Sequence, residues 1–125
     1  MIKWIFHILN IVVIILYLYP GSIAGYLIYH NFSKQPQITA DLLVSSNHVY
    51  AFLLLSVIGI ISYYNSNKKL IIIYLLFISI FLELSHLVIP NRAFQFSDLF
   101  GNILSVLLSL LLFNLVNYWK KNEFI

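Results

Sequence analysis

Four long apolar stretches dominate this chain and constrain its fold more than any other feature. They cover about residues 3–19, 48–64, 70–89 and 98–119, and turn formers or charged residues separate them. Each is close to the length that a helix needs to cross the hydrocarbon core of a bilayer. Hydrophobic residues make up 62% of the chain and charged residues only 9%, whereas a soluble domain has about 25% charged residues. The pattern therefore predicts one all-α domain over residues 1–125, an integral membrane four-helix bundle.

The basic residues predict how these four spans are oriented. Five of the seven Lys and Arg residues lie at the amino end, in the 65–69 turn and in the carboxyl-terminal tail, all on one side of a four-span bundle. Only Lys34 and Arg92 fall on the other side. By the positive-inside rule both termini are cytoplasmic. The first long connection, residues 20–47, is predicted to be a loop, and a helical continuation through Tyr29 is left open.

Composition also limits the class of function and the source. The chain has no cysteine, which excludes disulfides, thiolate metal sites and a cysteine nucleophile. Its basic residues form no patch with interleaved aromatics, so no nucleic-acid partner is expected. Abundant Ile, Leu, Asn, Tyr and Phe with scarce Ala are typical of an AT-rich bacterial genome, so we expect a multi-pass protein of the bacterial inner membrane. One alternative concerns the first stretch: Ser22-Ile23-Ala24 resembles a signal-peptide cleavage site, which leaves open whether the first span is retained.

Ionisable and amide side chains gather at one depth of the predicted bundle. Glu83 lies about 10 Å below the outer end of the third span, and His86 lies one turn shallower on the same helical face. A charge near mid-membrane costs on the order of 2.5–3.5 kcal/mol, so such residues usually face the bundle interior and mark a function. The full set comes from three spans and one loop, and it consists of His48, Glu83, His86, Arg92, Asp98 and Asn102.

These residue types predict roles in a polar pocket that faces outward. Glu83 is the candidate acid or base, and His48 or His86 the candidate proton shuttle. Arg92 is expected to hold an anionic group such as a phosphate. Asp98 and Asn102 would bind or orient these groups.

Each of these residues also has a purely structural interpretation. Asp98 follows Ser97 at a helix start, where an acidic side chain suits the helix dipole. Arg92 and Asp98 would then form only an ion pair that closes the loop. His86 would only neutralise Glu83, and Tyr17 and the other aromatic residues are expected to serve packing or the membrane interface.

The same residues, taken in order, resemble the VanZ-like family of small bacterial membrane proteins. In this chain a His opens one span (His48), a Glu stands near the end of the next (Glu83), Pro90-Asn91-Arg92 matches the family's Pro-x-Arg turn, and Asp98 to Asn102 match its Asp-x-x-x-Asn spacing. The resemblance covers about residues 45–115. It departs from the family pattern at His86, where Gln is usual, at Ser105, where Gly is usual, and near Val44, where the acid that often precedes the first His is absent.

The resemblance implies a place in the bacterial cell envelope, because the family takes its name from a protein linked to resistance to the glycopeptide teicoplanin. We therefore expect a membrane protein that binds or processes a lipid-linked glycan, a lipid head group or a lipoglycopeptide. The family supplies no established reaction, so enzymatic turnover is left open and no cofactor is predicted. The first alternative is a structural or accessory subunit whose polar layer only locks the helices together. The second is a zinc site built from His48, Glu83, His86 and Asp98.

Overall fold

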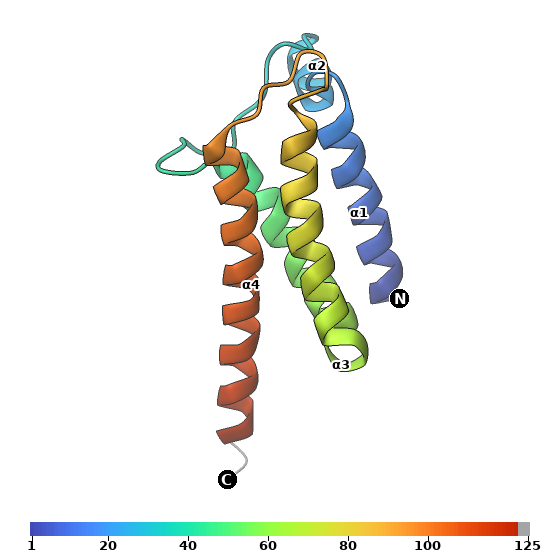
Figure 1. The fold of residues 1–125 in the computed structure, drawn as a ribbon, viewed down its shortest axis with the longest axis vertical. Helices are drawn as coiled ribbons and strands as arrows, with labels where there is room; N and C mark the ends of the chain where they lie inside the picture. The colour runs from blue at the N-terminus through green and yellow to red at the C-terminus, as the bar shows by residue number, and fades with distance from the viewer. Residues whose placement is uncertain (123–125) are drawn as a thin grey trace.

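A computed structural model describes residues 1–122 of the chain as a set of helices (Figure 1). The elements are α1 (Ile2–Leu18), α2 (Ile23–Tyr29), α3 (Ser46–Ser85) and α4 (Phe96–Asn122). No strand occurs within these described residues, which confirms the all-α prediction. The short α2 takes up the helical continuation through Tyr29 that the sequence left open.

Helix α3 is a hairpin of two antiparallel legs rather than one straight rod (Figure 1). Its backbone leaves the helical region at Asn67, where φ is −146° and ψ is 56°. This break lies within the 65–69 segment, whose polar residues predict a turn between the second and third apolar stretches. The two legs are therefore the counterparts of those two stretches.

The second leg of α3 ends at Ser85, four residues before the predicted end at Ile89. Residues 86–88 instead form tighter turns, in which the His86 N–H donates to the Glu83 carbonyl at 3.1 Å. In a continuous helix the ring of Pro90 would clash with the carbonyl of His86, four residues earlier, and Pro90 has no N–H to donate to it, so the helix stops before this point. Helix α4 begins two residues earlier than predicted and runs through Lys120 and Lys121, which suit the negative end of the helix dipole.

The chain bends sharply between α1 and α2, by 83°. The Ser22 hydroxyl caps α2 by accepting the Gly25 N–H at 2.9 Å. Gly25 lies so close to the following loop that a Cβ there would overlap the Lys34 carbonyl oxygen. The missing side chain therefore lets the loop lie directly against α2 at one end of the molecule.

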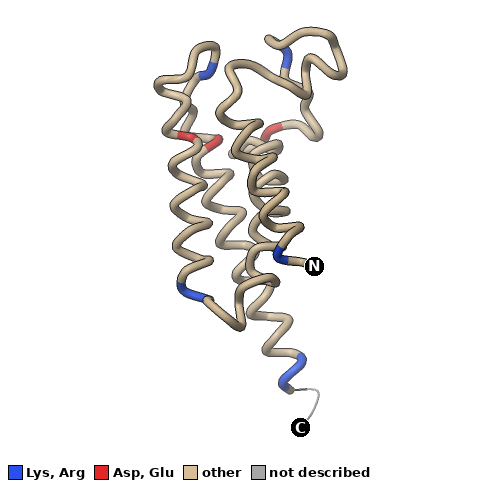
Figure 2. Tube along the Cα trace, turned by 90° about the vertical axis from the view of Figure 1, so that its right-hand side faces the viewer, with Lys and Arg blue, Asp and Glu red and all other residues tan. Residues whose placement is uncertain are grey.

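The start of α1 and the end of α4 both lie toward the end opposite α2, on the same side as the α3 reversal (Figure 1). Figure 2 shows basic residues at both ends of the molecule, whereas the acidic residues of the described chain lie toward the end that carries α2. The candidate site residues occupy this same end, because they come from the start of α3, the end of α3 and the start of α4.

The hydrophobic core is narrow: most large apolar side chains of α1 and α4 are exposed, and so are many of those of α3. Fully buried core residues include Phe52, Leu55, Leu75 and Val106. Within residues 1–122, α4 alone is long and apolar enough by itself to cross a membrane, with a mean hydropathy of 2.2 in its most apolar window. The bent α1–α2 pair is also long and apolar enough to cross a membrane when its two helices are counted as one span.

Candidate functional site

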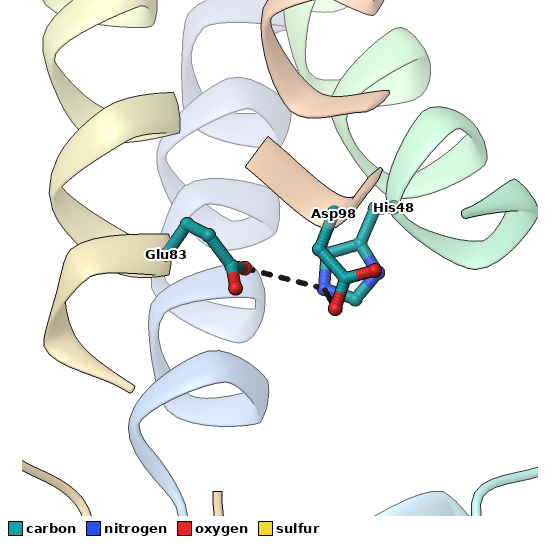
Figure 3. Close-up of side chains that lie close together, drawn as sticks. All are labelled: His48, Glu83 and Asp98. Atoms are coloured by element: carbon teal, nitrogen blue, oxygen red, sulfur yellow. Dashed lines mark ion pairs between the residues drawn. The ribbon is translucent and has the colours of Figure 1, made fainter. Parts of the chain in front are cut away.

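Three ionisable side chains from separate helical segments converge at the α2 end of the bundle. His48 lies in the first turns of α3, Glu83 in its last turn and Asp98 in the first turn of α4. Figure 3 shows the three side chains pointing toward one another. His48 Nε2 lies 3.6 Å from Glu83 Oε2 and 3.6 Å from Asp98 Oδ2. All three residues are buried, Glu83 completely.

The two oxygens of Glu83 have different surroundings. Oε1 accepts the backbone N–H of Gln95 at 3.2 Å and lies 3.4 Å from His86 Nδ1. Oε2 faces His48 and has no hydrogen-bond partner within the described chain. A buried polar atom without a partner is uncommon and costs stability unless something satisfies it.

His48 is held in place by the close approach of α4 to the first leg of α3. Its Nδ1 lies 2.9 Å from the Ser45 hydroxyl, so its Nε2 is the nitrogen that faces the two carboxylates. A Cβ at Gly101 would come within 3.2 Å of the Ser45 carbonyl oxygen. The absence of a side chain at this position is what lets the two helices bring Asp98 next to His48.

Tyr17 is part of this cluster, although the sequence predicts only packing for it. Its hydroxyl donates to Asn102 Oδ1 at 2.9 Å, and its ring lies edge-on to His48 and stacked with His86. Asn102 in turn donates to the Ser79 carbonyl at 3.1 Å, and His86 Nε2 lies 3.1 Å from the Tyr17 carbonyl. These bonds tie α1, the second leg of α3 and α4 together.

Arg92 does not form the expected ion pair with Asp98, and that structural interpretation is wrong. Its Nε donates to the Tyr19 carbonyl at 3.1 Å and its Nη2 to the Leu16 carbonyl at 2.7 Å. These carbonyls belong to the end of α1, where the helix leaves acceptors unpaired. Burial lowers the pKa of Arg92 from its ordinary value, yet a guanidinium remains protonated in proteins.

Three cavities adjoin the cluster; the smallest, about 190 Å³, has a polar wall that includes Asp41, Ser45, His48 and Asp98. Of the two larger cavities, the first has a volume of about 580 Å³, and its apolar wall includes Leu16, Ile23, Ile28 and Ile38. The second has a volume of about 420 Å³ and a more polar wall that includes Asp98, Gln95 and Asn91. His48, His86 and Arg92 line both of them, whereas Glu83 lines neither.

The structure thus brings the six predicted residues together in three ways: by direct contact, through Tyr17, or by lining the same cavities. His48 contacts both Glu83 and Asp98, and His86 contacts Glu83. Asn102 joins them through Tyr17, and Arg92 joins them across the cavities. The sequence missed Tyr17 and Ser45 as members. One feature of the sequence could have indicated Tyr17: it lies three residues before Pro20, which places it near the depth of His86 in the predicted bundle.

Comparison with models of known families, with curated protein sequences and with solved structures gave no match. The resemblance to the VanZ-like family therefore rests on the ordered residues of the sequence alone.

Proposed function

We propose that this chain is a multi-pass, VanZ-like protein of the bacterial cytoplasmic membrane, with both termini inside. Its outward-facing pocket binds or processes the head group of a membrane amphiphile: a lipid-linked glycan, a lipid or a lipoglycopeptide. The observation that carries the proposal is the pair of adjoining cavities, one mainly apolar and one polar, which share Arg92 and His48.

The outward apolar surface supports the membrane location. Large hydrophobic side chains are exposed along α4 and both legs of α3, as at Ile73, which is 67% exposed, and Leu111, which is 54% exposed. Each leg of α3 has about the length of a bilayer core, roughly 30 Å at 1.5 Å per residue. The uneven distribution of Lys and Arg between the two ends supports the orientation.

The two cavities match the two parts of an amphiphile. An acyl or prenyl chain fits the wall formed by Leu16, Ile23 and Ile28, and a phosphate fits beside Arg92. Arg92 uses two of its five N–H donors on α1 carbonyls, so three remain for an anionic group. A guanidinium already held by two backbone carbonyls loses little further freedom when it binds a ligand.

The buried cluster supports a role for His48 in contact with the ligand. His48 reaches both cavities, and Glu83 lies behind it with Oε2 toward the imidazole. In the processing form of the proposal, His48 exchanges a proton with the ligand and Glu83 stabilises the charged imidazole. His86 then acts through Glu83, by its contact with Oε1.

Direct binding measurements test the proposal. Purified protein in nanodiscs would be titrated with a polyprenyl phosphate, with phosphatidylglycerol and with phosphatidylcholine, and binding followed by native mass spectrometry. We expect an anionic amphiphile to bind more tightly than phosphatidylcholine, and Arg92→Ala to weaken that binding by about tenfold or more. Lys34→Ala removes the same charge from the same end but from outside both cavities, so it should bind as the wild type does. Equal effects of the two substitutions would contradict the proposal.

A structural or accessory subunit is the second candidate, and the Tyr17–Asn102–Ser79 chain of hydrogen bonds favours it. Such interhelical bonds lock helices together without any ligand. The test compares Glu83→Gln and Arg92→Ala for protein level, thermal stability and teicoplanin tolerance of the host. Loss of tolerance at normal level and stability would exclude the accessory role. Loss of the protein itself from the membrane would favour it.

A further inference from the structure

The spacing of His48, Glu83 and Asp98 does not fit direct hydrogen bonds. Both distances from His48 Nε2 to carboxylate oxygens are 3.6 Å, beyond the range of about 2.7–3.2 Å for such bonds. Ligand atoms around a tetrahedral zinc ion, each about 2.0–2.2 Å from the metal, lie about 3.4 Å from one another. One ligand atom from each of the three residues falls within 4.8 Å of the other two.

The unpaired oxygen of Glu83 points into the space between these three groups. Glu83 is fully buried, and its Oε2 lacks a hydrogen-bond partner among the described residues. Two buried carboxylates here face one imidazole, and the nearby Arg92 is engaged with α1 carbonyls instead. A divalent cation would neutralise both carboxylates and satisfy Oε2 at the same time.

The surrounding contacts orient the three side chains as the outer contacts of a metal site do. The imidazole that binds a metal usually donates its other N–H to an oxygen, and His48 Nδ1 has the Ser45 hydroxyl at 2.9 Å. The Gln95 N–H and His86 engage Oε1 of Glu83, which leaves Oε2 for a single bond to the metal.

We infer that His48 Nε2, Glu83 Oε2 and Asp98 Oδ2 form a binding site for one zinc ion. The structure corrects the four-residue zinc site considered from the sequence, because His86 faces the other oxygen of Glu83 and the Tyr17 carbonyl. Three protein ligands leave one position of a tetrahedral ion for water or a ligand oxygen. His48 and Asp98 both line the more polar cavity, so that position is reached from there.

Metal binding to the full-length protein tests this inference. The affinity tag would be removed, the purified protein stripped with a chelator in detergent, and Zn²⁺ titrated by calorimetry, with elemental analysis after dialysis. We expect one zinc per chain. Co²⁺ in its place should give the strong visible absorption of a four-coordinate ion. A wild-type protein that retains neither ion at micromolar concentration would overturn the inference, whatever the variants do.

Variants then locate the ion. His48→Ala and Asp98→Asn should each lower zinc affinity by about a hundredfold or more, because each removes a ligand. Ser45→Ala should lower it by about tenfold, through the orientation of His48. His30→Asn removes a histidine from the exposed loop end of α2, at a left-handed position that Asn tolerates, and should leave the affinity unchanged.

Two controls accompany these variants: one tests whether each variant is folded, and the other separates the zinc inference from the proposed function. Far-UV circular dichroism would establish that each variant keeps its helical content. Zinc bound with equal affinity by the wild type and by a folded His48→Ala variant would exclude this site. A zinc ion on His48 Nε2 leaves that nitrogen no proton to exchange, so this site replaces the proton-exchange role given to His48 in the proposed function. The titration contains no lipid, so a failure here leaves the amphiphile-binding proposal standing, and the nanodisc measurements decide that one separately.

Discussion

The hydrogen bond between Tyr17 and Asn102 offers a direct test of how the bundle is held together. The Tyr17 hydroxyl donates to Asn102 Oδ1 at 2.9 Å, and both side chains are buried. The bond joins α1 to α4, which otherwise make few contacts with each other. Substitutions at the two positions should therefore be coupled.

The expected loss of unfolding free energy depends on which buried hydrogen-bonding groups each substitution leaves without a partner. In the membrane setting proposed above, an interhelical hydrogen bond contributes about 0.6 kcal/mol on average and at most about 1.7 kcal/mol. Leaving a buried partner unsatisfied adds about 1–3 kcal/mol. We expect Tyr17→Phe to lower the free energy of unfolding by about 1 kcal/mol. Asn102→Leu should lower it by about 2 kcal/mol, because it also removes the bond to the Ser79 carbonyl.

The double variant distinguishes this bond from general packing. The double variant lacks both the Tyr17 hydroxyl and the Asn102 amide, so neither group is left buried without its partner. Its free energy of unfolding should therefore fall by about 1 kcal/mol less than the sum of the two single losses. Reversible unfolding in mixed micelles of mild detergent and dodecyl sulfate, followed by circular dichroism, measures all four proteins. Tyr118→Phe, on the exposed end of α4, is the matched control and should change nothing. Strictly additive losses would refute the argument.

Three further predictions concern the elements that build the site. Gly101→Leu should separate α4 from Ser45 and lower the melting temperature strongly, whereas Gly101→Ala should have a smaller effect; equal melting temperatures for Leu and wild type would contradict the close approach. Asp41 accepts the Ser46 N–H at the start of α3, and this hydrogen bond lowers the pKa of Asp41. The ionised Asp41 therefore stabilises the fold above its unfolded pKa of about 3.9, and this stabilisation is lost as the pH falls through the lower folded pKa. Asp41→Asn should therefore flatten the acid limb of a melting profile. Gly25→Ala should increase proteolysis of the loop after α2, because a Cβ overlaps that loop, and unchanged cleavage would argue against the contact.

The sequence predicted the polar cluster better than it predicted the contacts inside it. The depth of Glu83, His86 and Asp98 along their segments follows from helix rise and from the position of Pro90, so their common layer could be derived. The role of Arg92 could not, because its partners are backbone carbonyls at the end of α1, and carbonyls carry no sequence signal. Tyr17 was likewise ambiguous, since an aromatic residue near a span end serves packing, the interface or a hydrogen bond equally well.

The amino-acid sequence by itself determined the helical class, the position of the α3 reversal near Asn67 and the end of the molecule where the ionisable residues gather. These properties depend on local features, namely apolar length, turn formers and charge placement, which act over a few residues. Only the tertiary structure decided which atoms face one another: His48 Nε2 toward two carboxylates, His86 toward the far oxygen of Glu83, and Arg92 toward α1. Those relations depend on the rotation and spacing of helices distant in the chain, which are set by close contacts such as that at Gly101.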